Sequence, residues 1–225
     1  MSAPTIVFDL DGTLVDTAPD LVDTLNVILA REGLPAVPFG AARNMIGGGA
    51  RVLIERGLKA DGRAWHAAEV QRLYDDFVAH YGEHLADRSA PFPGAVEAIE
   101  ELSGQGCRFA VCTNKLEKLA VRLLDALKLL PHFSAICGQD TFGVQKPDPE
   151  MLLATIRRAG GTPGNAVMVG DSHNDIATAR RAGVPVIGVE FGYTETPIAE
   201  FGPDLVIGHF AKLPAAVSRI FSLAD

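Results

Sequence analysis

Short apolar runs alternate with helically spaced apolar residues over most of this chain. The first run, 5–8, is rich in β-branched residues and is followed by a turn with Gly12, a pattern that predicts a buried strand. Similar runs predict further strands at residues 108–112, 135–137, 166–169, 184–189 and 205–207. Because each run is nearly all apolar, we expect strands that are covered on both faces.

Helical patterns lie between these predicted strands. Apolar residues recur every three or four positions in 96–102, 116–130, 151–159 and 176–182. The last two stretches end at glycines, which commonly stop helices. Alternating strands and helices predict an α/β fold, in which a doubly wound, mostly parallel sheet carries helices on both faces.

Residues 15–86 break this alternation. Their apolar residues are spaced as in helices at 21–29, 52–58 and 70–85, and no convincing strand pattern occurs among them. We therefore expect a helical cap, residues 15–86, inserted after the first strand, and a return linker at 89–94. Residues 1–14 and 87–225 would then form the α/β core.

Composition narrows the class of protein. The chain has 225 residues, is 48% hydrophobic and carries a net charge of −8, which argues against nucleic-acid or anionic-membrane partners. It shows no signal peptide and no apolar run long enough to span a bilayer. Its three cysteines form no CxxC pattern, as expected for reduced thiols. We expect a cytoplasmic protein that is a monomer or a homodimer.

Polar clusters follow several of the predicted strands. Asp9 and Asp11 come directly after the first strand, and Thr113-Asn114 follows the second. Lys146 lies in a later loop, and a Gly-Asp segment at 170–175 follows the fourth strand. Ligands bind outside the carboxyl ends of the strands in open parallel sheets, so we expect these clusters to meet at one site.

These residue types suit phosphoryl transfer. Two carboxylates as close as Asp9 and Asp11 repel each other, so a divalent cation, a shared proton or both must compensate them. With Asp171 they could bind Mg²⁺, which prefers hard oxygen ligands. Lys146 offers a point charge for a phosphate, and Thr113 and Asn114 offer neutral hydrogen-bond donors.

The four motifs together resemble those of the haloacid dehalogenase superfamily, in order and over essentially the whole chain. This resemblance implies that Asp9 is a nucleophile forming an aspartyl-phosphate and that Asp11 is the general acid and base, with its backbone carbonyl on the metal. It also implies that Asp171 binds Mg²⁺ and that Asp175 either binds the metal or supports its ligands. Residues 15–86 resemble the cap of this superfamily.

Three further segments, 15–21, 46–53 and 188–193, resemble the phosphoglycolate phosphatases within this superfamily. The resemblance implies hydrolysis of 2-phosphoglycolate, although Gly48 stands where that family usually has Asn. Gly47, Gly48 and Gly49 precede a predicted helix. Their backbone N–H groups could bind a substrate anion, or the segment could be a flexible turn.

Other functions fit parts of this pattern. A phosphosugar mutase would share the aspartyl-phosphate, and a phosphatase could act on another small phosphate ester or on pyrophosphate. A dehalogenase would not need Asp11. A receiver domain, phosphorylated on Asp as a switch, would not need a cap. We expect a small phosphorylated metabolite as the partner.

Overall fold

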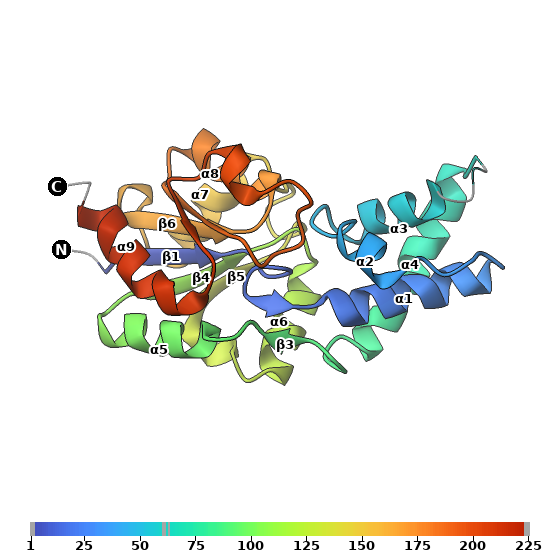
Figure 1. Cartoon of the computed structure of the whole chain (residues 1–225), viewed down its shortest axis with the longest axis horizontal. Helices are drawn as coiled ribbons and strands as arrows, with labels where there is room; N and C mark the ends of the chain where they lie inside the picture. The colour runs from blue at the N-terminus through green and yellow to red at the C-terminus, as the bar shows by residue number, and fades with distance from the viewer. Residues whose placement is uncertain (1–2, 60–61, 63, 223–225) are drawn as a thin grey trace.

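The core is an all-parallel sheet of six strands in the order β5-β4-β1-β6-β7-β8 (Figure 1). The computed structural model describes residues 3–59, 62 and 64–222. The strands are β1 (Thr5–Phe8), β4 (Arg108–Cys112), β5 (Phe133–Cys137), β6 (Ala166–Gly170), β7 (Val186–Val189) and β8 (Leu205–Ile207). The chain adds β4 and β5 on one side of β1 and then β6, β7 and β8 on the other, so the direction in which strands are added changes at β1. Open α/β sheets bind ligands at such a point.

Helices cover both faces of this sheet, which confirms the predicted fold class. One face packs against α5 (Ala95–Gly104), α6 (Glu117–Ala126) and α9 (Leu213–Ser222). The other face packs against α7 (Pro149–Arg158) and α8 (His173–Ala182). Short 3₁₀ helices lie at Leu130–His132, Pro163–Asn165, Ile198–Phe201 and Phe210–Lys212. None of the described helices has the length and apolar character that crossing a bilayer requires.

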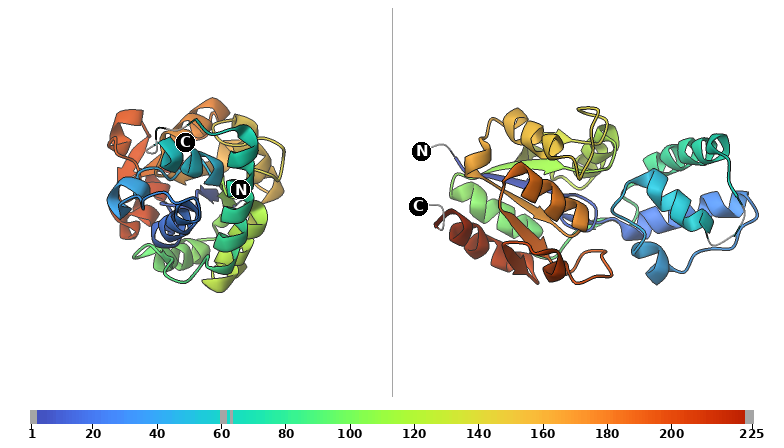
Figure 2. Two further views of the ribbon diagram at one scale, coloured as in Figure 1. Left: turned by 90° about the vertical axis from the view of Figure 1, so that its right-hand side faces the viewer. Right: turned by 90° about the horizontal axis from the view of Figure 1, so that it is seen from above.

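Four helices lie apart from the sheet, beyond the carboxyl ends of its strands (Figures 1 and 2). They are α1 (Ala18–Arg31), α2 (Phe39–Arg43), α3 (Ala50–Lys59) and α4 (Ala67–Glu83). Two short strands, β2 (Val15–Asp16) and β3 (Ala90–Pro91), pair antiparallel where the chain passes to these helices and returns. This arrangement supports our proposal that residues 15–86 form a separate cap.

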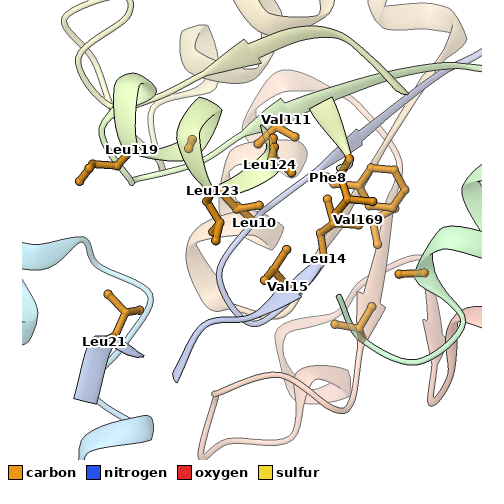
Figure 3. Close-up of a cluster of buried hydrophobic side chains, with 14 of the residues drawn as sticks. Phe8, Leu10, Leu14, Val15, Leu21, Val111, Leu119, Leu123, Leu124 and Val169 are labelled. Carbon is orange, nitrogen blue, oxygen red and sulfur yellow. The ribbon is translucent and has the colours of Figure 1, made fainter. Parts of the chain in front are cut away.

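A continuous apolar cluster runs from the sheet toward the cap helices (Figure 3). Phe8 in β1 and Leu10 and Leu14 in the following turn are fully buried. Leu21 in α1 belongs to the same cluster, on the cap side. The turn that carries Asp9 and Asp11 is therefore fixed by buried side chains on both sides.

The structure differs from the sequence predictions at several boundaries. The helix predicted at 116–130 ends at Ala126, because Lys128 has a positive φ of 60° and Pro131 follows in a 3₁₀ helix. The strand predicted from residue 184 begins at Val186, after Pro185, which has no N–H to donate. The helices α2 and α9 were not predicted.

Candidate active site

The predicted motifs meet at the carboxyl edge of the sheet, facing the cap. Asp9 follows β1, Thr113 follows β4 and Asp171 follows β6. Asp9, Asp11 and Thr113 line a cavity of about 40 Å³ with residues of α1, α3 and α4. The core contributes the polar groups of this cavity, and the cap contributes mainly apolar walls.

Lys146 joins two carboxylates. Its ammonium nitrogen lies 2.7 Å from Oδ1 of Asp9 and 2.6 Å from Oδ1 of Asp175, and all three side chains are buried. Burial alone would lower the pKa of Lys146, but the charges of Asp175 and Asp9 outweigh it and raise that pKa. Lys146 is therefore a permanent cation beside Asp9.

Three carboxylates form a compact acidic cluster. One oxygen from each of Asp9, Asp171 and Asp175 lies within 4.8 Å of the others. Burial, followed by neighbouring carboxylates, raises the pKa of Asp9 to about 8 and that of Asp171 to about 6. A divalent cation would offset both the burial of these charges and their mutual repulsion. Carboxylate oxygens are ligands that Mg²⁺ accepts. The donor set therefore fits Mg²⁺.

The carboxylate of Asp171 is held by two hydrogen bonds. The hydroxyl of Thr13 donates to Oδ1 at 2.7 Å, and the backbone N–H of Tyr193 donates to Oδ2 at 2.8 Å. Gly12 closes this packing: its φ is +87°, and a β-carbon there would lie 2.7 Å from Oδ2 of Asp171 and 2.8 Å from the Tyr193 ring. The motif therefore needs glycine at position 12.

The two carboxylates of the first motif have different partners. Asp11 does not share Lys146; its oxygens lie 2.8 and 3.1 Å from the ammonium nitrogen of Lys115. The hydroxyl of Thr17 also donates to Asp11 at 2.7 Å. Repulsion between Asp9 and Asp11 is thus reduced by two separate lysines in addition to the expected cation. Lys115 was not predicted as a site residue, although it directly follows Thr113-Asn114.

Thr113 and Asn114 mainly position other groups of the site. The side-chain oxygen of Asn114 accepts a hydrogen bond from the backbone N–H of Lys146 at 2.9 Å, and its nitrogen donates to the Lys146 carbonyl at 3.1 Å. These bonds fix the loop that carries Lys146. The hydroxyl of Thr113 accepts from the N–H of Lys115 at 3.2 Å and lines the cavity. Direct phosphate binding by Thr113, Asn114 and Lys146 stays a prediction.

Asp175 is bonded on both carboxylate oxygens. Oδ1 contacts Lys146, while Oδ2 accepts from the N–H and hydroxyl of Ser172 at 3.0 and 2.6 Å. A role for Asp175 as a metal ligand, or as a support for the metal ligands, stays a prediction.

The glycine turn lies partly at this site. Gly47 and Gly49 line the cavity, whereas Gly48 lies outside it against Val52. A β-carbon on Gly49 would lie 3.0 Å from the carbonyl oxygen of Asn114, so the cap approaches the core closely here. The N-terminus of α3 at Ala50 follows this turn.

A family model described as haloacid dehalogenase-like hydrolase matches residues 6–189, which include all four motifs. The chain belongs to this family. The resemblance to this family is thereby confirmed, and the matched range includes Asp9, Lys146 and Asp171.

Named relatives narrow the class further. A phosphoglycolate phosphatase of Mesorhizobium japonicum is 51% identical over 97% of this chain and 96% of its own length. Another, from Caulobacter vibrioides, is 50% identical over 96% of this chain and 91% of its own. The crystal structure of a predicted phosphoglycolate phosphatase from Haemophilus somnus 129PT has a TM-score of 0.89 at 33% identity, covering 96% of this chain and 98% of its own. The chain is therefore an enzyme of the phosphatase type, and the receiver-switch alternative is wrong.

Proposed function

We propose that this enzyme hydrolyses 2-phosphoglycolate to glycolate and phosphate through a phosphoenzyme formed on Asp9. The observation that carries the proposal is the pairing of Asp9 with the Lys146 ammonium at 2.7 Å, beside an acidic cluster and in the wall of a cavity between core and cap. The names of the full-length relatives support the substrate.

The first half of the reaction forms the phosphoenzyme. A carboxylate oxygen of Asp9 attacks the phosphorus as the bond from phosphorus to the glycolate oxygen breaks. Asp11 gives its proton to that oxygen, so that glycolate leaves with a neutral hydroxyl group. Lys146 stays charged and stabilises the anionic oxygens near Asp9.

The second half releases phosphate. Asp11 takes a proton from a water molecule as the water attacks the phosphorus, and the bond between phosphorus and Asp9 breaks. Asp9 and Asp171 would hold Mg²⁺ together with the backbone carbonyl of Asp11, and Asp175 would either join them as a ligand or support them. When bound, this cation supplies positive charge to the phosphoryl oxygens.

The small size of the cavity, about 40 Å³, favours a short leaving group over a sugar. A phosphosugar mutase remains the alternative with the same phosphoenzyme. Cytoplasmic location, a monomeric or homodimeric state and the absence of nucleic-acid partners remain predictions.

A panel of phosphate esters tests this proposal. Purified enzyme with Mg²⁺ is assayed for phosphate release from 2-phosphoglycolate, ethyl phosphate, glucose 1-phosphate, glucose 6-phosphate and pyrophosphate. We expect the highest kcat/KM for 2-phosphoglycolate. Interconversion of the two sugar phosphates without phosphate release would favour the mutase, and no turnover of any ester would overturn the proposal.

A further inference from the structure

One cation of the cavity wall pairs with Asp11 but takes part in no chemical step described above, and one buried hydroxyl of the wall has no role there. The ammonium of Lys115 lines the cavity, and among the described residues that do so it is the only cationic side chain. It lies 4.5 Å from the centre of the Tyr81 ring, which belongs to α4 of the cap. Lys115 therefore lies where the core meets the cap.

The hydroxyl of Tyr81 is buried without a hydrogen-bond partner among the described residues. The Lys115 ammonium lies over the Tyr81 ring and close to its hydroxyl, where its charge opposes the rise in the pKa of Tyr81 that burial causes, but it makes no well-formed hydrogen bond to that hydroxyl. Leaving a buried hydroxyl unpaired is unfavourable, and such groups commonly mark a place where a ligand binds. Tyr81 also lines the cavity.

The position of Asp11 determines which part of the substrate comes near Lys115. Asp11 must reach the oxygen that joins phosphorus to the leaving group, and the Lys115 ammonium lies 2.8 Å from Oδ1 of Asp11. In 2-phosphoglycolate, one methylene separates this bridging oxygen from the carboxylate. This separation is short enough for the carboxylate to come within hydrogen-bond reach of Lys115.

The surroundings make such a contact strong and selective. The Asp9 carboxylate repels an incoming carboxylate, so a cation and a donor are needed to hold it. Apolar side chains form much of the wall, and in their low dielectric an ion pair is stronger than in water. Among them are Leu21, Leu53, Phe77, Val78, Leu116 and Leu119.

A second cation near the cap does not serve this position. Arg51 lies 5.0 Å from the centre of the Tyr74 ring and bonds the side chain of Gln71. It borders a neighbouring cleft with Asp140 and does not line the cavity.

We propose that Lys115 and Tyr81 together bind the carboxylate of the substrate, and that this contact sets the preference for a carboxylated phosphate ester. This inference rests on the proposed function and names the residues that determine which leaving group the enzyme prefers. Lys115 exchanges part of its contact with Asp11 for the substrate, while Tyr81 brings its hydroxyl from the cap.

The test compares two substrates that differ in the carboxylate, 2-phosphoglycolate and ethyl phosphate, in Lys115→Met and Tyr81→Phe. Lys118→Met, at an exposed position on α6, is the matched control. We expect the ratio of the two kcat/KM values to fall about ten- to hundredfold in Lys115→Met, and about three- to tenfold in Tyr81→Phe, because one charged and one neutral hydrogen bond are lost. Lys118→Met should keep the wild-type ratio.

Loss of the contact between Lys115 and Asp11 in Lys115→Met slows hydrolysis of both substrates. The ratio of their kcat/KM values therefore reports only the effect of the carboxylate. Tyr81→Phe removes an unpaired hydroxyl and keeps the ring, so we expect this variant to fold; thermal unfolding checks both proteins. An unchanged ratio in both variants would overturn the inference and leave the phosphatase function standing. A wild-type enzyme without preference for 2-phosphoglycolate would also overturn it, whereas failure to hydrolyse any ester would instead refute the proposed function.

Discussion

The hydroxyl of Tyr193 donates a hydrogen bond to Asp16 at 2.7 Å, across the strands that lead into the cap. The same oxygen accepts hydrogen bonds from the backbone N–H groups of Thr17 and Ala18 at 2.7 and 2.9 Å, at the start of α1. The backbone N–H of Tyr193 binds Asp171. One residue thus connects the acidic cluster to the entry of the cap.

Tyr193→Phe should destabilise the protein by about 1–3 kcal/mol, because two backbone donors and Asp16 lose a buried partner. The free energy of unfolding, measured in urea, checks this value. We also expect a lower kcat, since the start of α1 is no longer fixed to the core and closure of the cap is less well defined.

Thr194→Val is a suitable control for Tyr193→Phe. Thr194 is the next residue, and its hydroxyl donates only to the carbonyl of Thr196 in the same loop. If both variants lost the same stability, the link through Tyr193 would have no special importance.

Asp11→Asn should slow esters with poor leaving groups most. General acid catalysis contributes about 10²–10⁴-fold and matters little when the leaving group is already stable without a proton. We expect a large loss of kcat/KM with 2-phosphoglycolate and a much smaller loss with p-nitrophenyl phosphate. Equal losses on the two esters would contradict the acid role of Asp11.

Activity should require Mg²⁺ and disappear with EDTA, and Asp171→Ala should lose most of the metal affinity. Isothermal titration of the metal measures this directly, with the exposed Asp125→Ala as the control. Ca²⁺ should inhibit, because it prefers more ligands and looser geometry than Mg²⁺. Full activity in metal-free buffer would rule out the metal site.

Metal affinity should also depend on pH. The pKa of Asp171 is raised to about 6 and that of Asp9 to about 8, so both carry protons below these values, and a protonated carboxyl binds a cation poorly. Affinity for Mg²⁺ should therefore rise as the pH increases from about 6 to about 8, with protons released on binding. A pH-independent affinity would contradict the raised pKa values.

The strands were the most predictable part of the fold. The predicted limits 5–8 and 205–207 match β1 and β8, because short apolar runs bounded by polar or glycine residues have little freedom in their ends. Helix α9 was missed although Leu213, Val217 and Ile220 have helical spacing and are buried. The short α2 contains only Ala42 as a buried residue and gives no periodic signal.

The motifs predicted which residues gather at the site, but not their partners. Lys115 pairs with Asp11 from 104 positions away, and this contact depends on the register of β1 against β4. Tyr193 reaches Asp16 across 177 positions in the same way. Spacing within a motif cannot reveal such pairs, because only the folded sheet brings them together.

The central claim is that Asp9 accepts the phosphoryl group. Enzyme incubated with substrate and quenched in acid, or trapped with a phosphate mimic such as beryllium fluoride, is digested and analysed by mass spectrometry. The account predicts phosphate, or its mimic, on Asp9, and neither label nor turnover in a folded Asp9→Asn variant. Label on any other residue, or turnover by Asp9→Asn at the wild-type rate, would contradict it.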